Sequence, residues 1–205
     1  MGKMVNMKFE TPLCELAFKY KTDKCPQIGH TYTPQYYRLL KDKKESFKKV
    51  LELGVGTVVS MKHVKGYIPG ASHRMWRDFF TNAMIYGTDI DPQCIFEDDR
   101  IKTFLVDTHR DWKKFSAIID EIGHDIDLVV DDGPHKTTVQ LVTVRRLMPI
   151  LNKGVIYIIE DSHNPYALRD NLPEYDCEVL YLRNEPTELY KNGKKDNNLV
   201  IVKHK

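Results

Sequence analysis

Five short runs rich in β-branched residues constrain the fold of this sequence more than any other feature. They are residues 50–53, 85–88, 103–106, 126–130 and 155–159, and each is followed by an acidic residue or a glycine turn. The intervening residues 75–83, 111–122 and 137–151 are long enough to form crossover helices. Strand-length apolar runs that alternate with helices are typical of a parallel α/β sheet. Ligands bind beyond the carboxyl ends of the strands in such sheets, which is where the acidic residues lie.

The two ends of the sequence depart from this alternation. Residues 178–182 and 199–202 are predicted strands joined by a polar loop, which favours an antiparallel pair at the end of the sheet. We therefore predict a mostly parallel seven-stranded sheet with helices on both faces. Residues 11–20 are predicted to form a helix, and residues 21–37, rich in His, Tyr, Thr and Pro, a loop or lid. Residues 1–45 would then hold N-terminal helices and the lid, and residues 46–205 the core.

Size and composition narrow the class of protein. A chain of 205 residues fits one domain, so residues 1–205 are taken as a single unit. A net charge of +2 is too small to indicate nucleic-acid binding. No apolar stretch is long enough to span a membrane, and the segment from Met1 to Glu10 lacks the apolar centre of a secretory signal. We expect a cytoplasmic protein that binds neither nucleic acid nor membrane.

A glycine turn after the first strand indicates a nucleotide-like ligand. Gly54 and Gly56 follow Glu52 there, and glycines let the backbone approach a ligand closely. Asp89 ends the next strand, in the place of an acid that holds ribose hydroxyls, and Asp107 ends the one after it. The third glycine of a dinucleotide motif is missing, and Gly70 is the candidate for that close approach. The alternative for each acid alone is a helix N-cap, more so for Asp107 than for Asp89.

Two acidic runs indicate a metal site with a base beside it. The first is Asp131-Asp132-Gly133-Pro134-His135, and the second is Glu160-Asp161. Asp132, Glu160 and Asp161 offer the hard oxygen ligands that Mg²⁺ or Mn²⁺ prefers. An unperturbed histidine titrates near neutral pH, so we assign His135 as general base, acting with Asp132. Each run alone is equally explained by a turn or a helix cap.

Together these motifs resemble the class I S-adenosylmethionine-dependent methyltransferases. The narrower resemblance is to the metal-dependent sugar O-methyltransferases of the macrocin and mycinamicin type, and it spans residues 16 to 161. It is carried by residues 22–24 (TDK), 30–32 (HTY), 51–56 (LELGVG), 70–80 (GASHRMWRDFF), 86–91 (YGTDID) and 131–135 (DDGPH). His73 and the pair Val58-Val59 depart from the family pattern.

The resemblance implies a Rossmann-like methyltransferase fold and roles for individual residues. Glu52, Gly54 and Gly56 would form the cofactor turn. Asp89 would hold the ribose of S-adenosylmethionine, and Asp107 would lie by its adenine. Lys24, Ser72 and Asp131 would lie near its methionine end, with a capping role for Asp131 as the alternative. The implied reaction is methylation of a sugar hydroxyl on a glycan or a glycosylated small molecule.

Several alternatives stay open at this point. The acceptor is a catechol-like phenol or an amine in one, and the chain is a non-catalytic S-adenosylmethionine-binding module in another. The sequence is also compatible with a homo-oligomer, or with one domain of a larger sugar-modifying polypeptide such as a virus-encoded glycosyltransferase. Five aromatic residues are candidates for stacking on the acceptor or for the core: Tyr20, Tyr32, Tyr36, Tyr37 and Trp76. His163 is either a pocket residue or a surface histidine.

Overall fold

Five parallel strands form the centre of the sheet in the computed structural model, which describes residues 8–205. The eight strands are β1 (Lys49–Leu53), β2 (Met84–Asp89), β3 (Glu97–Asp98), β4 (Ile101–Leu105), β5 (Leu128–Asp131), β6 (Ile156–Glu160), β7 (Tyr175–Tyr181) and β8 (Asn198–His204). Their order across the sheet is β3-β4-β2-β1-β5-β6-β8-β7. Strand β8 lies between β6 and β7 and runs antiparallel to both, so the predicted terminal antiparallel pair is confirmed.

One strand is present beyond the seven predicted. The two-residue strand β3 pairs antiparallel with the edge strand β4 through a tight turn, in which Arg100 adopts a φ of 54°. The Thr103 hydroxyl closes this hairpin, because it donates to the Phe96 carbonyl and accepts from the Phe96 amide. Two polar residues carry no strand periodicity, so the sequence gives no sign of β3.

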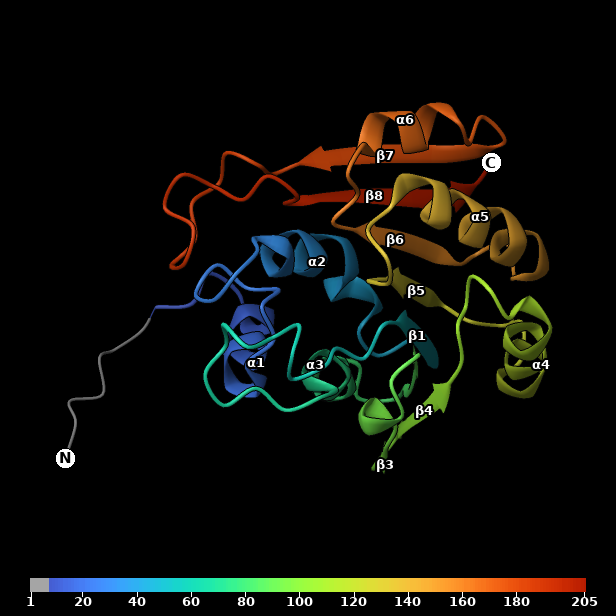
Figure 1. Ribbon diagram of the computed structural model, residues 1–205, viewed down its shortest axis with the longest axis horizontal. Helices are drawn as coiled ribbons and strands as arrows, with labels where there is room; N and C mark the ends of the chain where they lie inside the picture. Colours follow the sequence, from blue (N-terminus) through green and yellow to red (C-terminus); the bar gives the residue numbers. More distant parts are fainter. Residues whose placement is uncertain (1–7) are drawn as a thin grey trace.

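The helices cover the two faces of the sheet. They are α1 (Pro12–Tyr20), α2 (Tyr32–Leu40), α3 (Ala71–Phe79), α4 (Trp112–Ile122), α5 (Thr137–Leu147) and α6 (Pro165–Asp170), with three short 3-10 turns, Lys41–Lys43, Pro92–Cys94 and Met148–Ile150. Alternate residues of β5 enter different cores: Val130 packs with α1, α2 and α3, whereas Val129 packs with α4, α5 and α6. Figure 1 shows α1, α2 and α3 together on the left and α4 and α5 on the right. The predicted helices on both faces are confirmed.

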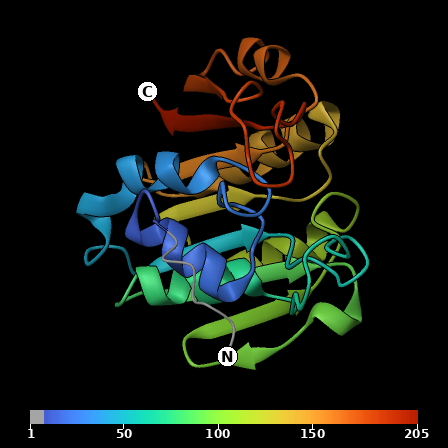
Figure 2. The same ribbon diagram turned by 90° about the vertical axis from the view of Figure 1, so that its left-hand side faces the viewer.

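Helix α2 corrects the prediction of a loop or lid over residues 21–37. Its buried side chains are Tyr32, Thr33, Tyr36 and Leu40, so one face of the helix is packed mainly through tyrosines. Pro34 lies in the first turn, where a missing amide hydrogen costs nothing. Tyrosine and proline do not read as a helical apolar stripe, which is why the helix was not predicted. Figure 2 shows α1 and α2 crossing in front of the strands.

Residues 1–7 lie outside the described part of the chain. They include most of the segment from Met1 to Glu10, for which no secretory signal is predicted. Across residues 8–205, none of the helices has the length and apolar character needed to cross a membrane.

Candidate active site

A cavity of about 670 Å³ opens at the carboxyl ends of the parallel strands. The predicted site residues that line it are Lys24, Gly54, Gly56, Ser72, Asp89, Asp107, Asp132, His135 and Asp161. Three predicted site residues do not line it: Glu52, Asp131 and Glu160. His163 is also part of the wall, which favours the pocket alternative for this histidine.

The glycine turn forms one end of the cavity. Gly54 and Gly56 have φ angles of 99° and 86°, which side chains rarely adopt. The Asp89 carboxylate accepts hydrogen bonds from the amides of Val55 at 2.9 Å and Gly56 at 3.2 Å. The end of β2 therefore holds the turn that follows β1. An added Cβ at Gly54 would lie 2.3 Å from the Asp132 carbonyl oxygen, so this turn also contacts the chain end that carries the acids.

We expect Gly54→Ala to lower the free energy of unfolding by about 1–3 kcal/mol, because alanine is strained at this φ angle. The close Asp132 backbone leaves no room for relaxation. Urea denaturation of the wild type and variant measures the loss. Gly154→Ala is the matched control, since its Cβ would meet only the end of the Asn152 side chain, at 3.2 Å. Equal losses in the two variants would contradict the argument.

Asp107 both caps a turn and lines the cavity. Its carboxylate accepts hydrogen bonds from the amides of His109 and Arg110, at 3.1 and 2.8 Å, and so caps a turn. The N-cap of helix α4 is Asp111 instead. Because Asp107 also lines the cavity, capping leaves it at the site.

Gly70 does not supply a close approach to a ligand. It begins α3 with a φ of 79°, and an added Cβ would lie 2.3 Å from the Phe96 ring. The Phe96 side chain is therefore enough to explain the glycine, and Gly70 does not line the cavity. Tyr67 takes the place near the turn, where its hydroxyl lies 3.1 Å from the carbonyl oxygens of Val55 and Gly56.

A buried lysine joins three of the acids. The Lys24 ammonium lies 2.7 Å from Asp132 Oδ2, 2.5 Å from Glu160 Oε2 and 3.2 Å from Glu52 Oε1. Burial lowers the pKa of Lys24, but the three carboxylates outweigh it and hold that pKa well above its usual range. Lys24 was expected near the methionine end of the cofactor, and its contacts are with the acids.

Glu52 lies beneath the cavity and orders the residues around it. It accepts a hydrogen bond of 2.7 Å from the Ser72 hydroxyl, and His73 Nδ1 lies 3.3 Å away. Burial raises the pKa of Glu52 to about 7 and lowers that of His73 to about 3, so His73 is neutral. His73, the departure from the family pattern, thus fits beside an acid inside the protein.

The buried Glu160 and Asp161 both accept hydrogen bonds from tyrosines of helix α2. The hydroxyl of Tyr36 donates to Glu160 Oε1, and that of Tyr32 donates to Asp161 Oδ1. Tyr32, Tyr36 and Trp76 are fully buried, so the core alternative holds for these three aromatic residues. Asp161 has a φ of 55°, a strained conformation for a residue with a side chain and one that is common at functional sites.

Asp132, His135 and Asp161 converge in the cavity beside the glycine turn, because the Asp132 amide donates to the Leu53 carbonyl at 2.9 Å. His135 Nε2 lies 3.5 Å from Asp132 Oδ1 and 3.7 Å from Asp161 Oδ2. One potential ligand atom from each residue falls within a group whose members lie within 4.8 Å of one another. Burial lowers the pKa of His135, but its hydrogen bond to Asp132 and the charges of Asp161 and Asp132 raise it to about 9. Two carboxylates beside an imidazole form a ligand set that could hold a divalent cation.

Asp131 does not take part in this convergence. Its carboxylate accepts a hydrogen bond of 2.8 Å from the Tyr157 hydroxyl, and a longer one of 3.4 Å from the Gly133 amide. Strand pleating explains the difference, because Asp131 and Val129 share the face of β5 that packs with α4 and α5. The contact predicted with the methionine end is therefore absent from the cavity wall, and the capping alternative describes Asp131 better.

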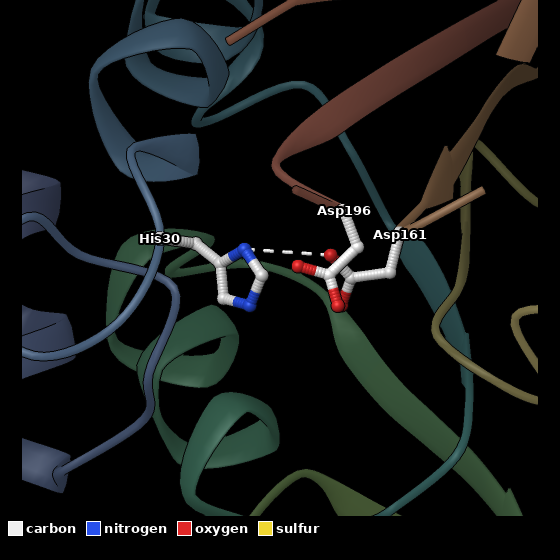
Figure 3. A group of neighbouring side chains, drawn as sticks. All are labelled: His30, Asp161 and Asp196. Carbon is white, nitrogen blue, oxygen red and sulfur yellow. Dashed lines mark ion pairs between the residues drawn. The ribbon is translucent and has the colours of Figure 1, made fainter. Parts of the chain in front are cut away.

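Residues from two distant segments complete the site without having been predicted. Figure 3 shows His30, Asp161 and Asp196 together, with His30 Nδ1 3.4 Å from Asp161 Oδ1. His30 stacks on Tyr32 with a centroid separation of 4.5 Å, and Lys194 contacts its other ring nitrogen. His30 belongs to the motif of residues 30–32, so the family resemblance could have identified it as a site residue. The loop between β7 and β8 has no periodic pattern that could have placed Lys194 and Asp196.

Comparison with known proteins relates the chain to methyltransferases. No family model matches the sequence. It is 35% identical over 156 residues to mycinamicin VI 2''-O-methyltransferase of Micromonospora griseorubida, covering 75% of this chain and 37% of that protein. It is 32% identical over 158 residues to 8-demethyl-8-α-L-rhamnosyl tetracenomycin-C 2'-O-methyltransferase of Streptomyces olivaceus, covering 75% of this chain and 38% of the relative.

A solved structure agrees with these relatives. MycE methyltransferase from the mycinamycin biosynthetic pathway, in complex with Mg, S-adenosylhomocysteine (SAH) and mycinamycin VI, superimposes with a TM-score of 0.67. The match has 27% sequence identity and covers 95% of this chain and 54% of that one. The chain has the class I methyltransferase fold and is a relative of the sugar O-methyltransferases. The chain spans little more than a third of the length of the curated relatives it matches.

Proposed function

We propose that the chain is an S-adenosylmethionine-dependent, divalent-metal-assisted O-methyltransferase that acts on a sugar hydroxyl. In this proposal His135 is the general base, assisted by Asp132. The metal ligands are Asp132, Glu160 and Asp161. The residues proposed to bind or position the cofactor are Lys24, Glu52, Gly54, Gly56, Ser72, Asp89, Asp107 and Asp131.

One observation carries the proposal. The glycine turn with Asp89 and the group of Asp132, His135 and Asp161 line the same cavity. A binding module does not need an imidazole between two carboxylates, whereas a proton-abstracting enzyme does. MycE, with Mg and SAH bound in a similar fold, supports the same assignment.

The residues of the cavity fit both groups. For S-adenosylmethionine, the two left-handed glycines bring the backbone, without side chains, to the cavity wall, and Asp89 and Asp107 lie at successive strand ends. For Mg²⁺ or Mn²⁺, Asp132 and Asp161 offer hard oxygen ligands. The single charge of Lys24 does not neutralise the carboxylates around it. Glu160 has both oxygens engaged, by Lys24 and Tyr36, so its part in metal binding requires Lys24 to share it.

His135 supplies the proton transfer. When bound, S-adenosylmethionine contributes an electrophilic methyl group and the cation contributes Lewis acidity toward the acceptor oxygen. The neutral His135 ring accepts the hydroxyl proton, and Asp132 and Asp161 stabilise the positive charge that the ring then carries. A base must be neutral beforehand, and a positive charge near the two carboxylates lowers the pKa of His135 from about 9 toward neutrality. Acid–base catalysis and cation binding are coupled in this way.

We expect EDTA to abolish methyl transfer, and Mg²⁺ or Mn²⁺ in excess to restore it. Asp132→Asn should weaken the response to the cation, because it removes one charged ligand. The measurement is transfer of a labelled methyl group as a function of cation concentration. Asp120→Asn on the exposed face of α4 is the matched control. Full activity of the wild type in EDTA would contradict the metal assignment.

A panel of acceptors tests the sugar assignment against its rivals. Free sugars, glycans and nucleoside-diphosphate sugars are compared with catechols and amines, using the labelled donor. Transfer to carbohydrates supports the proposal, and transfer only to catechols or amines replaces it. SAH binding without transfer to any acceptor would favour the binding module.

The setting of the enzyme is part of the proposal. We propose that residues 1–205 act as one cytoplasmic methyltransferase domain with a sugar-containing acceptor and neither a membrane nor a nucleic-acid partner. The chain matches only part of its relatives, so we also propose that it forms a homo-oligomer or belongs to a larger sugar-modifying polypeptide. The native mass of the purified protein tests for these associations.

A further inference from the structure

A second, smaller hollow adjoins the cavity. It has a volume of about 450 Å³ and is lined by His163, Arg183, Lys194, Lys195 and Asp196. We call it the basic hollow, because three of its five residues are cationic and one is acidic. His163 and Lys194 also line the main cavity, so the two spaces are neighbours that share part of their wall.

The basic hollow lies at the end of the cavity where the proposed base is found. The His163 amide donates to the His135 carbonyl at 3.3 Å, and Arg183 Nη2 donates to the His163 carbonyl at 3.4 Å. On its other side, Lys194 contacts His30, which lies beside Asp161. The glycine turn, Asp89 and Asp107 do not line it. A ligand in the basic hollow is therefore next to the acceptor and away from the nucleoside end of the methyl donor.

The cations of the basic hollow are incompletely neutralised. Asp196 Oδ1 lies 3.6 Å from the Lys194 ammonium. Within residues 8–205, no carboxylate oxygen lies within 4.0 Å of a side-chain nitrogen of Arg183 or Lys195. Arg183 Nε is buried without a hydrogen-bond partner, and its guanidinium lies 4.9 Å from the centre of the Tyr181 ring. A guanidinium beside two ammonium groups is suited to a phosphate, which accepts several charged hydrogen bonds at once.

We propose that the basic hollow binds a phosphate or diphosphate group of the acceptor, so that this enzyme methylates a phosphorylated sugar. The inference rests on the proposed function for the methylation, but the anion site itself does not. Arg183 and Lys195 hold the phosphate oxygens, and Lys194 links the bound phosphate to His30 and the reaction centre. The sugar ring then extends from the basic hollow toward His135.

Anion binding is measured first, by calorimetry of the full chain saturated with SAH. Inorganic pyrophosphate is the probe, and the variants are Arg183→Ala with Lys195→Ala, singly and together. We expect the double variant to weaken pyrophosphate binding at least tenfold while SAH affinity stays unchanged, since two charge-assisted contacts are lost. Lys191→Ala is the matched control, because this lysine is on the same loop but pairs with Glu188 outside both hollows.

Acceptor preference is measured second, with a sugar phosphate, a nucleoside-diphosphate sugar, the matching uronic acid and the free sugar. The expected result is a lower KM for the phosphorylated acceptors, which the double variant loses without a change for the free sugar. Equal pyrophosphate affinity in wild type and double variant overturns the inference, even if sugars are methylated. A preference for the uronic acid also overturns it. Pyrophosphate binding that depends on Arg183 and Lys195, with no transfer to any sugar, would instead refute the proposed function and leave the anion site standing.

Discussion

His135→Ala is expected to lower kcat by about 10²–10⁴-fold, the usual contribution of a positioned general base. The reason is geometric, since His135 is the imidazole held between Asp132 and Asp161 at 3.5 and 3.7 Å. SAH affinity should not change, because among the described residues no hydrogen bond or ion pair joins the His135 side chain to the glycine turn or to Asp89. The measurements are labelled methyl transfer for kcat and calorimetry for SAH.

The control for this prediction is His124→Ala. His124 is an exposed histidine that pairs with Asp120 beside α4, and its loss should leave kcat unchanged. His135→Gln keeps a polar side chain of similar reach and should be nearly as inactive as alanine, because an amide does not accept a proton at neutral pH. Wild-type turnover in either His135 variant would show that another group is the base.

The largest expected effect on stability is that of Lys24→Met, at about 3–5 kcal/mol, which is typical of removing one partner of a buried ion pair. Methionine has a similar volume, so packing is largely kept. The carboxylates of Glu52, Asp132 and Glu160 would lose the ammonium that all three contact. Urea denaturation without divalent cations measures the loss in the free energy of unfolding.

Lys49→Met is the matched control for the buried lysine. Lys49 pairs with Asp125, whose side chain is 71% exposed, and such a pair contributes about 0–1 kcal/mol. If Lys24→Met and Lys49→Met unfold at the same urea concentration, the buried carboxylates do not depend on Lys24. Stabilisation of Lys24→Met by Mg²⁺ beyond that of the wild type would indicate that cation and lysine balance the same acids.

The strands were predictable because burial on both faces leaves a continuous apolar run, as in Val129 and Val130. Helix α2 was not, because Tyr32 and Tyr36 supply its buried face in place of aliphatic side chains. The grouping of the acids at the cavity was also predictable, since acids that follow parallel strands converge at one edge of the sheet. Their individual roles as ligands or cofactor contacts stay predictions.

The contacts of Lys24 were beyond reach of the sequence for a different reason. Its partners Asp132 and Glu160 are 108 and 136 residues away, and no local pattern indicates which of several acids a lysine will meet. The placement of Asp131 could have been predicted from the sequence. Successive side chains of a strand point to opposite faces, which puts Asp131 on the opposite face from Asp132. The loop from β7 to β8 is polar and aperiodic, so Arg183 and Lys195 could be placed only by the fold.

The position of β8 has a consequence for the order of events during synthesis. This strand is the last of the sheet to leave the ribosome, yet it inserts between β6 and β7 and its first residue accepts a hydrogen bond from the Asp161 amide. A nascent chain that ends before β8 exposes open edges of β6 and β7, which are prone to mispairing with other chains. It also lacks the support that holds Asp161 in its strained conformation. The proposed reaction centre therefore forms only when β8 has completed the sheet, so an incomplete chain lacks it.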